Sequence, residues 1–138
     1  MGVITTMLRF LAVVTAGLAV AGAAAAAPLP VTPGDISLIE EGHAYVFRSN
    51  DSLPLYTFDK DAPGRSNCTG PCESLWPPLL ASAGSAPLGE WTLVKRADGK
   101  LQWAWRGRPL YTYAKDGVDK PAGDGAGGVW HVIPPIAK

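Results

Sequence analysis

Short runs of β-favouring residues separated by turn residues dominate the chain from residue 43 onwards. Residues 43–48 (HAYVFR) are rich in aromatic and β-branched side chains, and residues 53–58 (LPLYTF) form a second such run. The four residues between them, Ser-Asn-Asp-Ser, are typical of a turn. The pattern predicts a β-hairpin built from these two runs.

A second hairpin is predicted further along the chain, from a clearer pattern. Residues 100–105 (KLQWAW) alternate with period two, an Arg-Gly pair forms a tight turn, and residues 108–113 (RPLYTY) return. An earlier run at 91–95 is followed by Ala-Asp-Gly, a turn that pairs it with the strand that begins at residue 100. A last short strand is expected at 129–133, between a glycine-rich loop and two prolines.

The two returning strands belong to an internal repeat with an offset of 55 residues. Residues 54–61 (PLYTFDKD) match residues 109–116 (PLYTYAKD) at six of eight positions. A β unit of this size cannot bury its apolar face alone, so two copies are expected to pack together. We therefore predict an all-β fold: a small antiparallel sandwich or barrel-like domain over 41–138, with half-repeats at about 43–65 and 91–120.

The N-terminus has the layout of a secretory signal peptide over residues 1–27. Arg9 precedes an apolar run, and a tract of alanine and glycine follows it. An uncleaved membrane anchor is the alternative, but no basic cluster follows the tract, as a stop-transfer signal would require. We expect cleavage without membrane insertion, a flexible lead-in over 28–40, and a periplasmic or secreted protein.

Charge and motif searches exclude several classes of function. Arg9 is the one charged residue of 1–27, so eleven basic and twelve acidic residues remain after it. This near-neutral balance gives no case for binding nucleic acid or an anionic membrane. The chain contains no GxGxxG, Walker, GxSxG or HExxH motif, so we expect neither a bound cofactor nor an enzyme.

The two cysteines, Cys68 and Cys72, lie in a loop rich in glycine and proline. In an oxidising compartment this pair is expected to form a local disulfide, which contributes roughly 2 kcal/mol because the ring is small. The alternative is a metal or redox site, for which His43 and His131 are the only histidines. The spacing matches no zinc or haem motif, so we expect no metal site.

The repeated strands carry aromatic residues on one face and an aspartate just past the end. The aromatic residues are Tyr56, Phe58, Tyr111 and Tyr113, and the carboxylates are Asp61 and Asp116. We expect the rings to pack in the core and the carboxylates to accept backbone N–H groups and fix the following turns. The alternatives are a tyrosine hydroxyl at a ligand, and two aspartates that form an acid/base pair or a cation site.

Trp103 and Trp105 project to one face of a predicted strand. Burial between the two halves is the expected outcome. The alternative is an exposed aromatic surface that binds a sugar ring or a peptide.

Three motifs in order resemble a known bacterial family, the secreted repeat of unknown function, also described as predicted lipoproteins with a Yx(FWY)xxD motif. They are the doubled YxFxxD and YxYxxD at Tyr56 and Tyr111, the segment SNCTGPC at 66–72 followed by LWPPL, and GGVWHV at 127–132. The resemblance implies a cell-envelope location and a β-rich repeat fold, and nothing about chemistry. Unlike many relatives, this chain has no lipid-bearing cysteine near residue 27.

The sequence thus favours a non-enzymatic binding or structural accessory of the cell envelope, whose partner is an unknown envelope or extracellular component. The alternative is a periplasmic electron-transfer or metal-handling accessory that uses Cys68, Cys72 and a histidine. An enzyme built on Asp61 and Asp116 is a third, weaker hypothesis.

Overall fold

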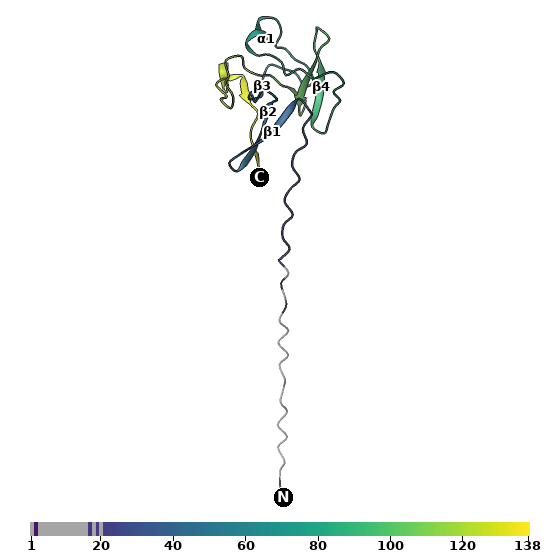
Figure 1. Ribbon diagram of the computed structural model, residues 1–138, viewed down its shortest axis with the longest axis vertical. Helices are drawn as coiled ribbons and strands as arrows, with labels where there is room; N and C mark the ends of the chain where they lie inside the picture. The colour runs from purple at the N-terminus through teal and green to yellow at the C-terminus, as the bar shows by residue number, and fades with distance from the viewer. Residues whose placement is uncertain (1, 3–16, 18, 20) are drawn as a thin grey trace.

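The computed structural model of the protein describes residues 2, 17 and 19 and the continuous stretch 21–138. Most of the predicted signal peptide therefore lies outside the described residues. Residues 21–33 contain no helix or strand and reach the folded body as an extended segment (Figure 1). Within the described part of the chain, no helix is long and apolar enough to cross a bilayer.

Antiparallel strands make up most of the regular structure in the described residues, which confirms the all-β prediction. Three small sheets are present, and they do not form a closed barrel. The first sheet has the order β1 (Ile36–Glu41), β2 (Ala44–Ser49), β8 (Ile136–Ala137); the second pairs β3 (Tyr56–Phe58) with β7 (Trp130–Val132); the third has the order β4 (Trp91–Lys95), β5 (Leu101–Trp105), β6 (Arg108–Pro109). A short helix α1 (Pro71–Leu75) and a 3₁₀ turn η1 (Ala126–Gly128) complete the elements.

The third sheet follows the pattern of the sequence closely. Strands β4 and β5 pair from Trp91 opposite Trp105 to Lys95 opposite Leu101. After the Arg106-Gly107 turn β6 returns, but it covers only Arg108–Pro109 of the predicted strand 108–113. Both turn residues have positive φ, 52° and 78°, as a two-residue hairpin turn matched to the strand twist requires.

The predicted hairpin of residues 43–48 and 53–58 is wrong. Strand β2 pairs with β1 and β8, whereas β3 pairs with β7 near the other end of the chain. The turn after β2 does form, because the Ser49 N–H donates to the carbonyl of Leu53 at 3.0 Å. Pro54, which forms one bridge to Arg48, has no N–H to continue the ladder, and the chain then leaves β2.

Strand β1 begins inside the segment 28–40, which was predicted to be a flexible lead-in, and ends one residue beyond it. Its sequence at 36–41 (ISLIEE) has the same order of apolar and polar residues as 91–96 (WTLVKR), again at the offset of 55. The hairpins β1–β2 and β4–β5 are therefore equivalent parts of the two repeats. Each repeat begins with a hairpin and continues into the segment that carries its motif, 56–61 or 111–116.

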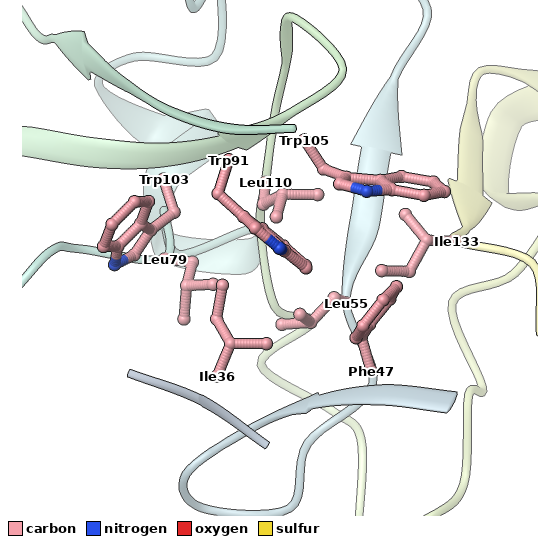
Figure 2. Close-up of a cluster of buried hydrophobic side chains, with 9 residues drawn as sticks. All are labelled: Ile36, Phe47, Leu55, Leu79, Trp91, Trp103, Trp105, Leu110 and Ile133. Atoms are coloured by element: carbon pink, nitrogen blue, oxygen red, sulfur yellow. The ribbon is translucent and has the colours of Figure 1, made fainter. Parts of the chain in front are cut away.

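The main core lies between these two hairpins (Figure 2). Ile36 and Phe47 rise from β1 and β2 toward Trp91, Trp103 and Trp105 of β4 and β5. Phe47 meets Trp91 edge-on, with ring centroids 4.8 Å apart. The remaining members of the core are Leu55, Leu79, Leu110 and Ile133.

This core contains Trp103 and Trp105, the two tryptophans that could have formed an exposed aromatic surface. Trp103 and Trp105 are 1% and 7% exposed, so they form no open surface and lie between the halves. The Trp103 indole N–H donates to Asp35 at 2.9 Å, which satisfies its polar group inside the fold.

Candidate functional site

The tyrosines and aspartates of the repeated motif bond to each other across the two repeats. The Tyr56 hydroxyl donates to Asp116 Oδ2 at 2.6 Å, and the Tyr111 hydroxyl donates to Asp61 Oδ2 at 2.8 Å. The tyrosine of each repeat thus binds the aspartate of the other. We call this reciprocal arrangement of four side chains the tyrosine–aspartate lock.

The backbone beside the lock shows the same reciprocity. The N–H of Tyr56 donates to the carbonyl of Tyr111 at 2.8 Å, and the N–H of Tyr111 donates to the carbonyl of Tyr56 at 3.0 Å. Two residues that exchange both hydrogen bonds in this way form a hydrogen-bonded pair of an antiparallel ladder. The two repeats are therefore related by an approximate twofold axis that passes between these tyrosines.

The second oxygen of each carboxylate is bound by the loop that follows it. Asp61 Oδ1 accepts the N–H of Asn67 at 2.7 Å, and Asp116 Oδ1 accepts the N–H of Ala122 at 2.8 Å. Asn67 and Ala122 are again 55 residues apart. Each aspartate fixes its own turn and holds the opposite tyrosine, so both of its oxygens are engaged in structural bonds.

Burial and the carboxylates keep both tyrosines neutral. Burial, aided by the bond to Asp61, raises the pKa of Tyr111 to about 12, although the hydroxyl of Ser66 acts in the opposite direction. Burial and the bond to Asp116 raise the pKa of Tyr56 even further above its ordinary value. Burial also raises the pKa of Asp61, against the bonds from Asn67 and Tyr111.

Four aromatic rings form a continuous stack beside the lock. Trp76 and Trp130 are parallel within 3°, with centroids 3.9 Å apart. Tyr113 stacks on the outer face of Trp76 at 4.3 Å, and Phe58 stacks on that of Trp130 at 4.2 Å. Each ring of the stack has its equivalent in the other repeat, so the order along it is symmetric.

The lock tyrosines pack edge-on against this stack. Tyr56 meets Trp76 with centroids 5.2 Å apart, and Tyr111 meets Trp130 at 5.1 Å. Together with Cys68 these rings form a second buried cluster, separate from the core between the hairpins. The expected packing role of the motif aromatics is therefore what the structure has.

Cys68 and Cys72 form a disulfide between the loop after Asp61 and α1. Cys68 is fully buried, and its carbonyl accepts a bond from Arg96 Nη2 at 2.9 Å. The same guanidinium donates to Gln102 at 2.7 Å and to Ser66 at 3.0 Å, and it forms an ion pair with Glu73. Ser66 in turn lies 2.7 Å from the hydroxyl of Tyr111, so this polar network reaches the lock.

Sequence reasoning missed Arg96 and Gln102. Both are buried, at 5% and 0% exposure, yet they lie at the end of β4 and on the strand β5 in a pattern that predicts hydrophobic core. The usable signal was the alternation itself, because Gln102 precedes the core residue Trp103 by one position and thus lies on the opposite face of the strand. There Gln102 accepts a bond from Arg96, which also donates to the carbonyl of Cys68 in the disulfide loop.

The structure does not bring the histidines to the cysteines. His131 Nε2 lies 2.7 Å from Asp59, which also pairs with Arg108 at 3.1 Å, on an exposed part of the surface. In the portion of the chain with described placement, no group of three or more His, Cys, Asp or Glu side chains is arranged to hold a metal ion.

The family model for a secreted repeat of unknown function matches the chain twice, at residues 48–80 and 92–133. Together the two matches cover more than half of the sequence, and each contains one copy of the motif. The chain belongs to this family of secreted repeats. Searches of curated proteins and of solved structures give no significant match.

The two matched copies coincide with the symmetric halves of the fold. Each copy holds one lock tyrosine, one lock aspartate and one tryptophan of the central stack. They extend beyond the predicted half-repeats of 43–65 and 91–120, because the tryptophan segments at 76 and 130 are part of the repeat. Membership of the family of secreted repeats supports an exported location.

Proposed function

We propose that this secreted repeat is a non-enzymatic binding module of the cell envelope, located in the periplasm or outside the cell. One observation carries the proposal: the polar groups of the family motif are each other's partners, and none is left over for a substrate. Tyr56, Tyr111, Asp61 and Asp116 hold the two repeats together as one body. Recognition of a partner then belongs to the surface that this body presents.

The protonation states of the lock favour a structural role over a catalytic one. A general acid or base works best when its pKa lies near the operating pH. The pKa of Tyr111 is raised to about 12 and that of Tyr56 is raised further, so both hydroxyls stay protonated at neutral pH. The two aspartates are bonded to different tyrosines and to different loops, which is unlike a pair that shares a proton.

The alternative, an electron-transfer or metal-handling accessory, gains no support from a specific contact. It requires Cys68, Cys72 and a histidine to act together. In the structure the two sulfur atoms bond to each other, and His131 interacts with Asp59 instead.

The test is to remove the lock hydroxyls and measure folding and binding separately. Y56F and Y111F should each lower the free energy of unfolding by about 1.5–3 kcal/mol, because each removes a hydrogen bond to a carboxylate. Below their unfolding temperatures, both variants should bind isolated cell envelopes as the unsubstituted protein does, in a saturable manner. Co-sedimentation measures the binding, and urea unfolding measures the stability.

Y113F is the matched control, because Tyr113 belongs to the same aromatic stack and Phe58 is its equivalent in the other repeat. It should change neither stability nor binding. A Y111F protein that keeps its stability but loses envelope binding would make the motif a ligand site and overturn the proposal. Chemical change of the bound envelope material that depends on Asp61 or Asp116 would overturn it as well.

A further inference from the structure

One side of the disulfide loop carries a cleft with an unusual balance of charge. The cleft has a volume of about 430 Å³ and lies between the loop after Asp61 and the end of β4. Three cations line it, Arg65, Lys95 and Arg96, together with the polar residues Ser66, Asn67 and Thr69. No aspartate or glutamate is among the described residues that line it.

The three cations differ in how they are held. Arg96 is fixed at the base of the cleft by Glu73, Gln102, Ser66 and the carbonyl of Cys68. Arg65 and Lys95 are exposed at the rim, and no ion pair joins either of them to a carboxylate of the described residues. Asp61 interacts with Arg96, but its oxygens are taken by Tyr111 and Asn67.

The equivalent place in the other half of the molecule shows that this charge is not a requirement of the fold. At the offset of 55, Lys95 and Arg96 correspond to Glu40 and Glu41, and Arg65 corresponds to Lys120. There the acids are neutralised within the protein. Glu41 and Asp119 both pair with Arg48, and Glu40 pairs with Lys138.

The two places thus have the same backbone framework and different electrostatics. The framework is shown by one equivalent bond in each half: the N–H of Gly64 donates to the carbonyl of Gly107, and that of Asp119 donates to the carbonyl of Ser52. In one place the acids are paired within the protein, while the other keeps two cations, without an ion-pair partner among the described residues, around a hollow. Two unpaired cations beside a pre-formed hollow favour an oxyanion.

We infer that the cleft between Arg65 and Lys95 binds the phosphate group of a phosphate monoester. A monoester carries a charge of about −1.5 to −2 near pH 7, which matches the two unpaired cations better than the single charge of a carboxylate. The cleft is larger than a phosphate, which leaves space for part of the organic group. The inference rests on the proposed binding function and names the ligand class of that function.

The test titrates the exported protein with glucose 6-phosphate, with inorganic phosphate, and with glucuronate, which carries a carboxylate on a similar sugar. We expect glucose 6-phosphate to bind with a dissociation constant of about 1 mM or below, and glucuronate to bind at least about tenfold more weakly. R65A/K95A should weaken the binding of glucose 6-phosphate by about tenfold or more, because it removes both direct charge-assisted contacts. Isothermal titration calorimetry at low salt measures all three ligands.

The matched control is K115A/K120A, which removes two exposed lysines from the equivalent loop of the second repeat. It changes the net charge by the same amount and should leave the binding unchanged. Equal weakening by both double variants would show unspecific attraction and overturn the inference, as would equal affinity for glucuronate. Envelope co-sedimentation separates the two proposals. If the protein binds cell envelopes but has no affinity for phosphate, only the inference about the cleft is overturned. If the protein binds neither envelopes nor phosphate, the proposed binding function is overturned too.

Discussion

The two repeats build the same lock but fix the loop behind it in different ways. In the first repeat, the disulfide links the loop after Asp61 to α1, and Arg96 donates a hydrogen bond to the carbonyl of Cys68 in this loop. In the second repeat, Gly123 stands at the position equivalent to Cys68, and its N–H donates to the hydroxyl of Tyr56 at 3.2 Å. The comparison shows that the motif needs an anchored loop, whereas the chemistry of the anchor can differ.

Gly123 shows why the second loop does without a cysteine. A side-chain carbon at this position would lie 2.6 Å from Trp76 and 2.9 Å from Tyr113. The loop therefore approaches the aromatic stack more closely than any other residue type allows. Direct packing of backbone on rings takes the place that the disulfide has in the first repeat.

The largest effects are expected in the aromatic stack. W76A and W130A should each lower the free energy of unfolding by about 3–5 kcal/mol, because each opens a cavity at the centre of the second cluster. Urea unfolding followed by circular dichroism measures both. If the halves are equivalent, the two losses should agree within about 1 kcal/mol, and the double variant should lose less than their sum because the rings are in contact. A loss confined to one of the two variants would contradict the symmetric stack.

A smaller effect is expected at the loop of the second repeat. G123A should lower the free energy of unfolding by about 1–3 kcal/mol, because the new methyl group forces Trp76 and Tyr113 to move. G117A is the control in the same loop, since a side-chain carbon there meets only Lys120 at 4.0 Å, an ordinary contact. Equal stability of G123A and the unsubstituted protein would show that the loop does not rest on the rings.

The smallest effect is a difference between Asp61 and Asp35 in how their contributions to stability depend on pH. Burial raises the pKa of Asp61, so its contribution to stability is present below the pKa of the unfolded chain and is lost as the pH rises. For Asp35, burial acts in the same direction, but the hydrogen bonds from Ser82, Trp103 and Ser85 outweigh it and lower the pKa. Its contribution is present above the unfolded pKa and is lost as the pH falls.

These opposite signs can be measured with D61N and D35N. Between about pH 3 and pH 6, the stability of the unsubstituted protein relative to D61N should fall, while its stability relative to D35N should rise. Urea midpoints at several pH values give both slopes, whatever the absolute cost of each substitution. Slopes of the same sign would contradict the assignment of one of the two carboxylates.

Local patterns predicted the third sheet well and the first sheet poorly. The alternation of residues 100–105 and the Arg106-Gly107 turn define β5 and β6, because both the strand period and the turn chemistry are local properties. Strand β1 went unrecognised because its neighbours are rich in proline and glycine. Extending the offset of 55 backwards from the motif, to compare 36–41 with 91–96, would have found it.

The pairing of the motif residues was beyond such reasoning. The sequence shows that Tyr56 and Tyr111 are repeated, and that Asp61 and Asp116 follow them, but not which tyrosine meets which aspartate. The exchange between repeats depends on the approximate twofold axis, which arises from the packing of distant segments. For the same reason the local pattern predicts that β3 pairs with the strand before it, β2, although its partner β7 lies more than 70 residues further along.

The exchange of strands between the repeats also affects the order in which the protein can fold. Strand β3, which carries the motif tyrosine of the first repeat, pairs with β7 in the last part of the second repeat. The motif segment of the second repeat lies against the chain around Pro77 of the first repeat. The hairpins β1–β2 and β4–β5 pair residues that are close in sequence, but β3 has no partner strand until β7 is present, so the second buried cluster can close only when the chain is nearly complete.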